Sequence, residues 1–273
     1  MINTNPMKYL FSLAMMVVCL SGLAQDLELF QRKTFVSTDG KKLLYRILYP
    51  ENYDSTKKYP LVLFLHGAGE RGNDNEKQLI HGAKLFVTDE NRKKFPAIVI
   101  FPQCAEESYW STVKIDRTKT PIHFDFDYSR PASSDLSLTI ALVKSLLKKK
   151  LIDKKRVYVM GLSMGGMGTF EIVFREPKLF AAAVPICGGG DVKHYDKRIK
   201  KTSFHVFHGE QDAVVNVNQS REMVEKIKQL GGKVVYKEYP NVNHNSWDNA
   251  FAEPDFLSWV FSVSRKDTKK RMK

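Results

Sequence analysis

The most informative stretch of the sequence reads Arg156-Val-Tyr-Val-Met-Gly-Leu-Ser-Met-Gly-Gly-Met-Gly-Thr-Phe170. Val157 to Met160 has the apolar character of a short buried strand, and the apolar residues after the turn recur at helical spacing. Between them lies Gly161-Leu-Ser-Met-Gly165, a G-x-S-x-G pattern whose glycines allow a sharp, strained turn. Such a strand, turn and helix would expose the hydroxyl of Ser163 at the carboxyl end of a sheet, with the amide of Met164 directed at the same place. An ordinary turn between a strand and a helix is the alternative.

Length and composition are typical of one domain. The chain has 273 residues, of which 43% are hydrophobic and 27% charged. That length is enough to bury one large core, and neither an internal repeat nor a linker rich in Pro, Gly and Ser divides it. We therefore expect residues 25–273 to form a single domain.

The first residues resemble an export signal. Lys8 precedes an apolar run from Tyr9 to Leu20, and Gly22-Leu-Ala24 supplies the small residues that a signal peptidase needs. A signal peptide over residues 1–24 is predicted, with cleavage before Gln25. The run is shorter than the roughly 20 residues of a membrane span, so we expect no stable membrane insertion after cleavage and a periplasmic or secreted protein. An uncleaved anchor is the alternative.

The chain is strongly basic, with a formal net charge of +13. This charge could indicate an anionic partner such as a polysaccharide, a membrane surface or an acidic substrate. The basic runs at 148–150, 154–156 and 269–273 are also typical of solvated helix ends and a chain terminus, and we favour that interpretation. No nucleic-acid-binding motif is present, so no nucleic-acid partner is expected.

Two cysteines, Cys104 and Cys187, remain after the predicted cleavage. Both follow predicted strands, and the chain has no dense cysteine framework of the kind that staples small exported domains. We expect two free, mostly buried thiols.

The order of apolar segments predicts an α/β fold. Eight segments have strand character, and they cover residues 29–36, 41–49, 61–65, 97–101, 157–160, 181–186, 204–207 and 233–239. One helical pattern begins directly after the turn at 161–165. Others cover residues 136–147, 219–230 and 254–263. An antiparallel hairpin at the amino terminus followed by repeated βα units predicts a mostly parallel sheet with helices on both faces.

A long insertion at about 105–131 separates two of these units and is rich in aromatic side chains. Loops of this length are usually functional or disordered, and one so aromatic is expected to form a wall or partial lid over a pocket. On this interpretation Trp110 lines the pocket together with Trp247 from the end of the chain. A surface loop folded on its own aromatic residues is the alternative.

A serine hydroxyl needs a neighbouring imidazole to take its proton, and the imidazole needs an acceptor that holds one tautomer. His244 follows the last predicted strand in a polar loop, from which its side chain can reach Ser163. Asp212 follows the strand before that one. In open parallel sheets the site lies beyond the carboxyl ends of the strands, and all three residues come just after such an end. Asp191 and Glu210 remain alternatives for the acid.

The other histidines fit the base role less well. His205 lies inside a predicted strand, and His208 is too near Asp212 in sequence for the two to bracket the serine. His66 begins the glycine-rich turn His66-Gly-Ala-Gly-Glu-Arg-Gly72, where we expect it to brace the turn. The amide of Ala68 in that turn can donate to the same oxyanion as the amide of Met164.

Four blocks of the sequence resemble those of bacterial α/β-hydrolases of the phospholipase/carboxylesterase and dienelactone hydrolase-like group. They are Leu63-Phe-Leu-His-Gly-Ala-Gly-Glu-Arg-Gly72, Gly161-Leu-Ser-Met-Gly-Gly166, His208-Gly-Glu-Gln-Asp212 and His244-Asn-Ser-Trp247. The resemblance covers nearly all of the chain after the predicted signal. It implies a serine carboxylic-ester hydrolase with Ser163, Asp212 and His244 as triad, the amides of Ala68 and Met164 as oxyanion hole, and no metal or other cofactor.

Two departures limit what the resemblance implies about substrate. Dienelactone hydrolases carry a cysteine at the position of Ser163, and the aromatic insertion is longer than in compact carboxylesterases. Aromatic walls would suit an acyl or aryl group, including an ester carried by plant polysaccharide. A serine peptidase of the prolyl oligopeptidase type and a catalytically silent glycan-binding protein stay open as alternatives.

Overall fold

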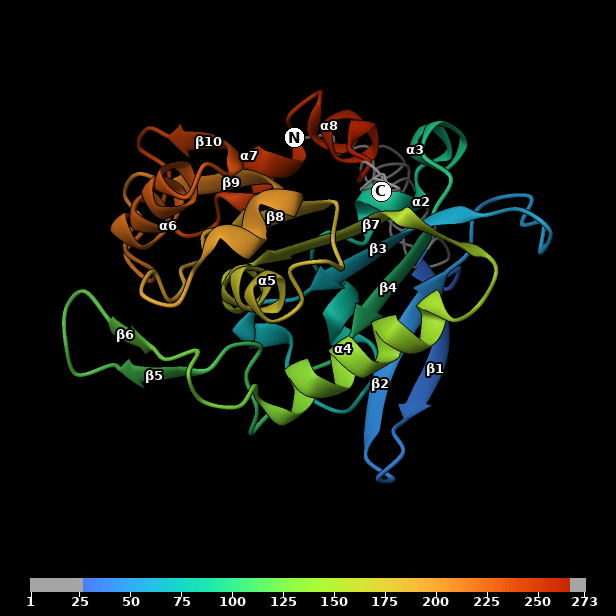
Figure 1. Ribbon diagram of the computed structural model, residues 1–273, viewed down its shortest axis with the longest axis horizontal. Helices are drawn as coiled ribbons and strands as arrows, with labels where there is room; N and C mark the ends of the chain where they lie inside the picture. The colour runs from blue at the N-terminus through green and yellow to red at the C-terminus, as the bar shows by residue number, and fades with distance from the viewer. Residues whose placement is uncertain (1–26, 266–273) are drawn as a thin grey trace, which may run out of the picture.

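A computed structural model describes residues 27–265, so the predicted signal peptide at 1–24 lies outside the described residues. Eight strands form the central sheet in the order β1-β2-β4-β3-β7-β8-β9-β10 (Figure 1). Their bounds are β1 Gln31–Val36, β2 Lys42–Leu48, β3 Tyr59–Leu65, β4 Ile98–Pro102, β7 Ile152–Leu162, β8 Ala182–Ile186, β9 Ser203–Gly209 and β10 Lys233–Tyr239. The β1–β2 and β2–β4 pairs are antiparallel, and the pairs from β4 to β10 are parallel. The predicted fold class is confirmed.

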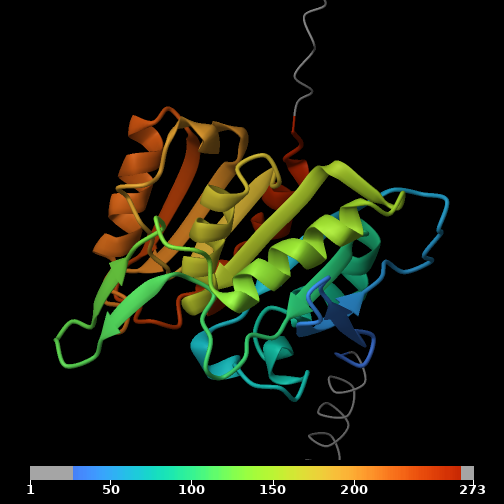
Figure 2. The same cartoon turned by 60° about the horizontal axis from the view of Figure 1, so that its bottom comes forward.

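Helices cover both faces of the sheet, as predicted. They are α2 Lys84–Val87, α3 Asp89–Lys94, α4 Ser134–Leu147, α5 Met164–Arg175, α6 Asn218–Gln229, α7 Trp247–Phe251 and α8 Phe256–Ser262. In Figure 2, α4, α5 and α6 lie over one face, with α8 behind the sheet. Successive strand residues point to opposite faces. On β3, Leu63 packs in the core under α4, α5 and α6, whereas Phe64 packs in the core that includes α8.

The insertion contains regular structure that was not predicted. Two short strands, β5 Val113–Asp116 and β6 His123–Phe126, pair in an antiparallel hairpin that projects beyond the end of the sheet (Figures 1 and 2). Its core-facing residue Phe124 packs with Met167 of α5 and with Val215, which follows β9. The insertion is therefore a packed unit and not an irregular loop.

The two thiols lie apart in the core. Cys104 and Cys187 are both buried and unpaired, which confirms the prediction of free cysteines. Burial raises the pKa of both thiols, so they stay protonated at neutral pH.

Within residues 27–265, no helix is both long enough and apolar enough to span a membrane.

Candidate active site

Ser163 lies on a sharp turn between β7 and α5. Its backbone angles, φ +54° and ψ −118°, lie in a region that costs a non-glycine residue of the order of 1–3 kcal/mol. The neighbouring glycines are required by close packing at this turn. A Cβ atom at Gly165 would collide with the carbonyl oxygen of Leu65 on β3, and one at Gly161 would collide with the carbonyl oxygen of Gly165. The serine is thus presented at the carboxyl end of the parallel strands.

His244 lies between Ser163 and Asp212. Its Nε2 is 2.9 Å from Ser163 Oγ, and its Nδ1 is 2.8 Å from Asp212 Oδ2. A carboxylate can only accept, so Nδ1 donates to Asp212, and Nε2 is left free to accept from the serine hydroxyl. The Trp247 ring packs edge-on against the imidazole, with 5.5 Å between the ring centroids. Three residues from distant parts of the sequence therefore form one hydrogen-bonded chain.

Asp212 is buried and fully hydrogen-bonded. Its Oδ1 accepts from the amides of Val214 and Val215, each at 2.8 Å. Its Oδ2 lies 3.1 Å from His208 Nε2 as well as 2.8 Å from His244. Burial raises the pKa of this carboxyl, but the hydrogen bonds from His208, His244 and the Val215 amide outweigh it and hold the pKa well below its usual value. Asp212 is therefore an anion at the pH where an imidazole is neutral.

The role of His208 was not foreseen from the sequence. Its ring is fully buried, with Nε2 2.8 Å from the carbonyl oxygen of Val215 and Nδ1 2.7 Å from the hydroxyl of Ser220. That hydroxyl donates to the carbonyl oxygen of Gly188. His208 therefore joins the Asp212 loop to the start of α6. The four-residue spacing between His208 and Asp212 was the one sequence signal for this contact.

The alternative acids lie elsewhere. Asp191 Oδ2 accepts from the amide of Tyr128 and lies 2.6 Å from His194 Nδ1. Glu210 accepts from the amide of Asn241. Among the described residues neither carboxylate contacts His244, so Asp212 is the acid that the fold brings to the imidazole.

The amides of Ala68 and Met164 both open a helical turn. Ala68 is the first residue of a 3₁₀ turn over Ala68–Glu70, and Met164 is the first residue of α5. Amides at the start of a helix have no acceptor within it, and the dipole of α5 favours negative charge at this end. In the sequence, Ala68 comes two residues after His66, and Met164 comes directly after Ser163.

His66 braces the turn that carries Ala68, as expected. Its Nδ1 lies 2.6 Å from the carbonyl oxygen of Gly67, and its Nε2 accepts from the amide of Cys104 at 3.0 Å. Burial lowers the pKa of His66 to about 4, so the ring is neutral at physiological pH. Nδ1 is then the protonated nitrogen that donates to Gly67.

A cleft of about 230 Å³ opens over Ser163 and His244. Its wall includes Trp247 and the side chains Tyr109, Arg117 and Phe124 from the insertion. Trp110 does not line it. The Trp110 ring is completely buried against His66, and its Cβ lies where a side chain at Gly168 would be. Tyr109 therefore faces the cleft while its neighbour Trp110 points into the core.

Among residues 27–265, two clusters of side chains have ligand atoms close enough to share a metal ion. Cys187, Asp212 and His244 form one, and Asp127, Asp191 and His194 form the other. In the first, burial raises the pKa of the thiol, and the Asp212 and His244 atoms are already bonded to each other. Metal binding there would require a thiolate and would break the link between imidazole and carboxylate. This donor set suits proton transfer better than metal binding.

The sheet order, the serine turn and the histidine beyond the last strand define an α/β-hydrolase. The model of the phospholipase/carboxylesterase family matches residues 52–257, and the chain belongs to this family. This is a family of carboxylesterase-type hydrolases.

Individual relatives and a solved structure agree with this assignment. The chain is 23% identical over 196 residues to a probable feruloyl esterase C of Aspergillus terreus, covering 71% of this chain and 63% of that protein. It is 28% identical over 197 residues to a bifunctional acetylxylan esterase/xylanase of Neocallimastix patriciarum, covering 69% of this chain and 26% of that protein. A crystal structure of a thermostable esterase shares 38% identity with a TM-score of 0.79, covering 88% of this chain and 64% of that one. The chain thus spans less than two thirds of each of these proteins.

Proposed function

We propose that this protein is an exported serine esterase in which Ser163 is the nucleophile, His244 the general base and Asp212 the residue that orients the base. The observation that carries the proposal is the continuous contact from Ser163 Oγ through His244 to Asp212. The proposal includes a signal peptide at 1–24 and one catalytic domain over residues 25–273.

The reaction proceeds through an acyl-enzyme. Ser163 Oγ attacks the ester carbonyl carbon while its proton passes to His244 Nε2, and the amides of Ala68 and Met164 donate to the oxyanion. The tetrahedral intermediate collapses, the carbon–oxygen bond to the alcohol breaks, and His244 returns the proton to the leaving alcohol. Water, deprotonated by His244, then attacks the acyl carbonyl and releases the acid and free Ser163.

The substrate we propose is an acyl or aryl ester carried by a polysaccharide. Tyr109, Phe124 and Trp247 offer the cleft three aromatic walls, and aromatic walls favour a flat or apolar acyl group. The names of the two curated relatives, a feruloyl esterase and an acetylxylan esterase, favour the same class. A panel of acetyl, feruloyl and longer acyl esters, with matched amides, distinguishes an esterase from a peptidase.

Replacement of the nucleophile tests the proposal directly. We expect Ser163→Ala to lower kcat by roughly 10⁴-fold or more without unfolding the protein, because only transition-state binding by the amides remains. Ser258→Ala, an exposed serine on α8, is the control and should retain full activity. Labelling by a fluorophosphonate should be lost in Ser163→Ala alone. Activity of Ser163→Ala close to that of the wild type would refute the mechanism, and failure of the wild type to be labelled would favour a silent binding protein.

A further inference from the structure

A second pocket lies at the opposite end of the strands from Ser163. It has a volume of about 490 Å³, and its lining includes Ala181, Ser203 and Lys233, which stand at the amino-terminal ends of β8, β9 and β10. β9 is seven residues long, so about 20 Å of strand separates this pocket from the loop that carries Asp212. The pocket is therefore distinct from the catalytic cleft.

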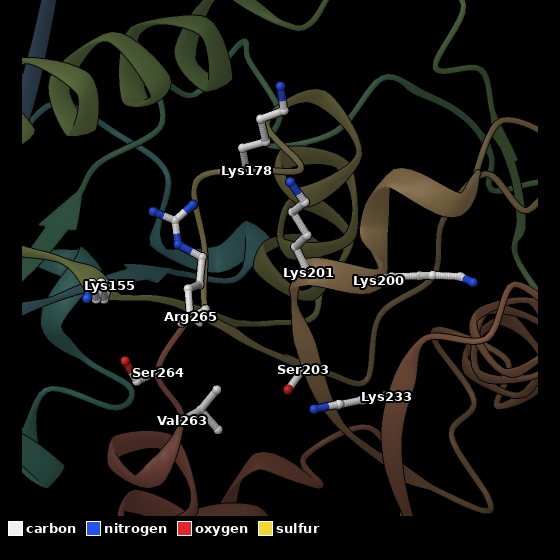
Figure 3. A pocket seen from close by; sticks show the side chains of 10 residues that line it. Lys155, Lys178, Lys200, Lys201, Ser203, Lys233, Val263, Ser264 and Arg265 are labelled. Carbon is white, nitrogen blue, oxygen red and sulfur yellow. The ribbon is translucent and has the colours of Figure 1, made fainter. Parts of the chain in front are cut away.

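The pocket is strongly cationic. Six of its lining residues are basic, and none of its lining residues is acidic; the basic ones are Lys155, Lys178, Lys200, Lys201, Lys233 and Arg265. Figure 3 shows Lys201 and Arg265 rising from separate segments, with Lys233 below Ser203 in this view and Lys200 extending away from the other two.

Three lysines of this pocket have no ion-pair partner within the part of the chain that the structure describes. No carboxylate in residues 27–265 forms an ion pair with Lys178, Lys201 or Lys233. Arg265 Nη2 donates to the carbonyl oxygen of Lys154, but its Nε is buried and has no hydrogen-bond partner among residues 27–265. Cations held this close together repel one another unless an anion lies between them.

The basic surface continues along the same edge of the sheet. A neighbouring hollow shares Lys155 and is lined by Lys58, which precedes β3, and by the runs at 148–150 and 154–155. Its one acidic residue, Asp153, is already paired with Arg156 at 2.8 Å. From β3 to β10 this edge crosses four strand spacings of about 4.8 Å, or roughly 19 Å. We call the residues that line these two pockets the basic edge.

We propose that the basic edge binds an acidic polysaccharide, a glycan with carboxylates repeated along its length, and so anchors the enzyme on the polymer that carries its ester substrate. The polymer part of this inference rests on the proposed function. The row of ammonium groups extends far beyond the reach of one small anion, and its length fits several repeating carboxylates. The recessed shape of the pocket at the start of β8, β9 and β10, and the lack of large apolar side chains among its described lining residues, disfavour a flat lipid surface. That lining also has no aromatic side chain on which single-stranded nucleic acid bases could stack.

A matched pair of charge reversals tests this inference. Lys201→Glu/Lys233→Glu changes the basic edge, and Lys42→Glu/Lys93→Glu makes the same change in net charge at exposed lysines of β2 and α3. Binding to polygalacturonate is measured by isothermal titration at low and high salt. We expect the first variant to bind roughly tenfold more weakly or worse and the second to bind like the wild type, with affinity falling as salt rises. Both variants should keep the wild-type kcat/KM on a small soluble ester.

Each other outcome overturns the inference. Equal loss in both variants would mean that only net charge matters, and no loss in the first would mean that the polymer binds elsewhere. Binding of the wild type to anionic lipid vesicles or to duplex DNA, but not to polygalacturonate, would identify a different class of partner. Because binding is measured without turnover, the result remains readable even if Ser163→Ala shows that the proposed mechanism is wrong.

Discussion

Asp212 has two histidine neighbours, and only one of them reaches Ser163. Its Oδ2 contacts both His208 and His244, but His208 is sealed in the core by Ser220 and the carbonyl oxygen of Val215. His244 uses only Nδ1 to contact Asp212, and its Nε2 lies 2.9 Å from Ser163 Oγ. The two histidines therefore differ in burial. His208, which is fully buried, helps to hold Asp212 as an anion, whereas His244, which is partly exposed, links Asp212 to Ser163.

The acid assignment gives a residue-scale prediction. Asp212→Asn would present an amide to His244 and favour the tautomer that cannot accept from Ser163, so we expect kcat to fall by roughly 10⁴-fold. Asp191→Asn is the matched control, since Asp191 is equally buried but contacts Tyr128 and His194 instead. Steady-state kinetics with one soluble ester, together with circular dichroism, measures both. The opposite ranking of the two variants would transfer the acid role to Asp191.

The sequence allowed the three candidate catalytic residues to be located in the fold more easily than the residues around them. The chain positions of Ser163, Asp212 and His244 follow strand ends, and strand ends can be located from apolar runs. Which of two adjacent aromatic residues faces a cleft depends on tertiary packing, so Trp110 was assigned to the pocket that Tyr109 in fact lines. The contact of His208 with Asp212 depends likewise on how one loop folds back on α6.

At the scale of elements, one buried carboxylate attaches the insertion to α5. Glu171 accepts from the hydroxyl of Ser111 and from the hydroxyl of Thr112, each at 2.8 Å. It also pairs with Arg175, which donates to the carbonyl oxygen of Arg130 at 2.9 Å. Both ends of the insertion are therefore tied to the helix that begins directly after Ser163. Four-residue strands such as β5 and β6 carry too little pattern to be predicted, and no sequence pattern indicates this attachment.

This attachment predicts a change in substrate preference. Glu171→Ala would leave Arg175 without its partner and free both ends of the insertion, so we expect a loss of roughly 3–5 kcal/mol in unfolding free energy. The wall formed by Tyr109 and Phe124 should loosen, which raises KM for a feruloyl ester more than for an acetyl ester. Glu176→Ala is the control, because its pair with exposed Lys144 is worth less than about 1 kcal/mol. Equal KM changes for both esters would contradict the proposed role of the wall.

At the scale of the whole molecule, two buried histidines make stability depend on pH. Burial lowers the pKa of His66 and of His205 to about 4, against 6.5 for a free imidazole. Between these values the unfolded chain binds a proton on each ring and the folded chain does not. Stability is therefore complete above pH 6.5 and is lost as the pH falls toward 4, by roughly 3 kcal/mol for each histidine.

His205 allows this pH dependence to be tested without disturbing the active site. Its ring packs between Phe207 and Trp259, with centroid distances of 4.1 and 4.9 Å, and it forms no hydrogen bond in the part of the chain that the structure describes. An apolar ring of similar size fits there without titrating. We expect His205→Phe to flatten the fall in unfolding free energy between pH 6.5 and 4 by about one proton, measured by urea denaturation at a series of pH values. His123→Gln removes an exposed histidine on β6 and should leave the slope unchanged. If His205→Phe leaves the slope as in the wild type, then His205 already titrates in the folded protein, and the acid sensitivity must come from other groups.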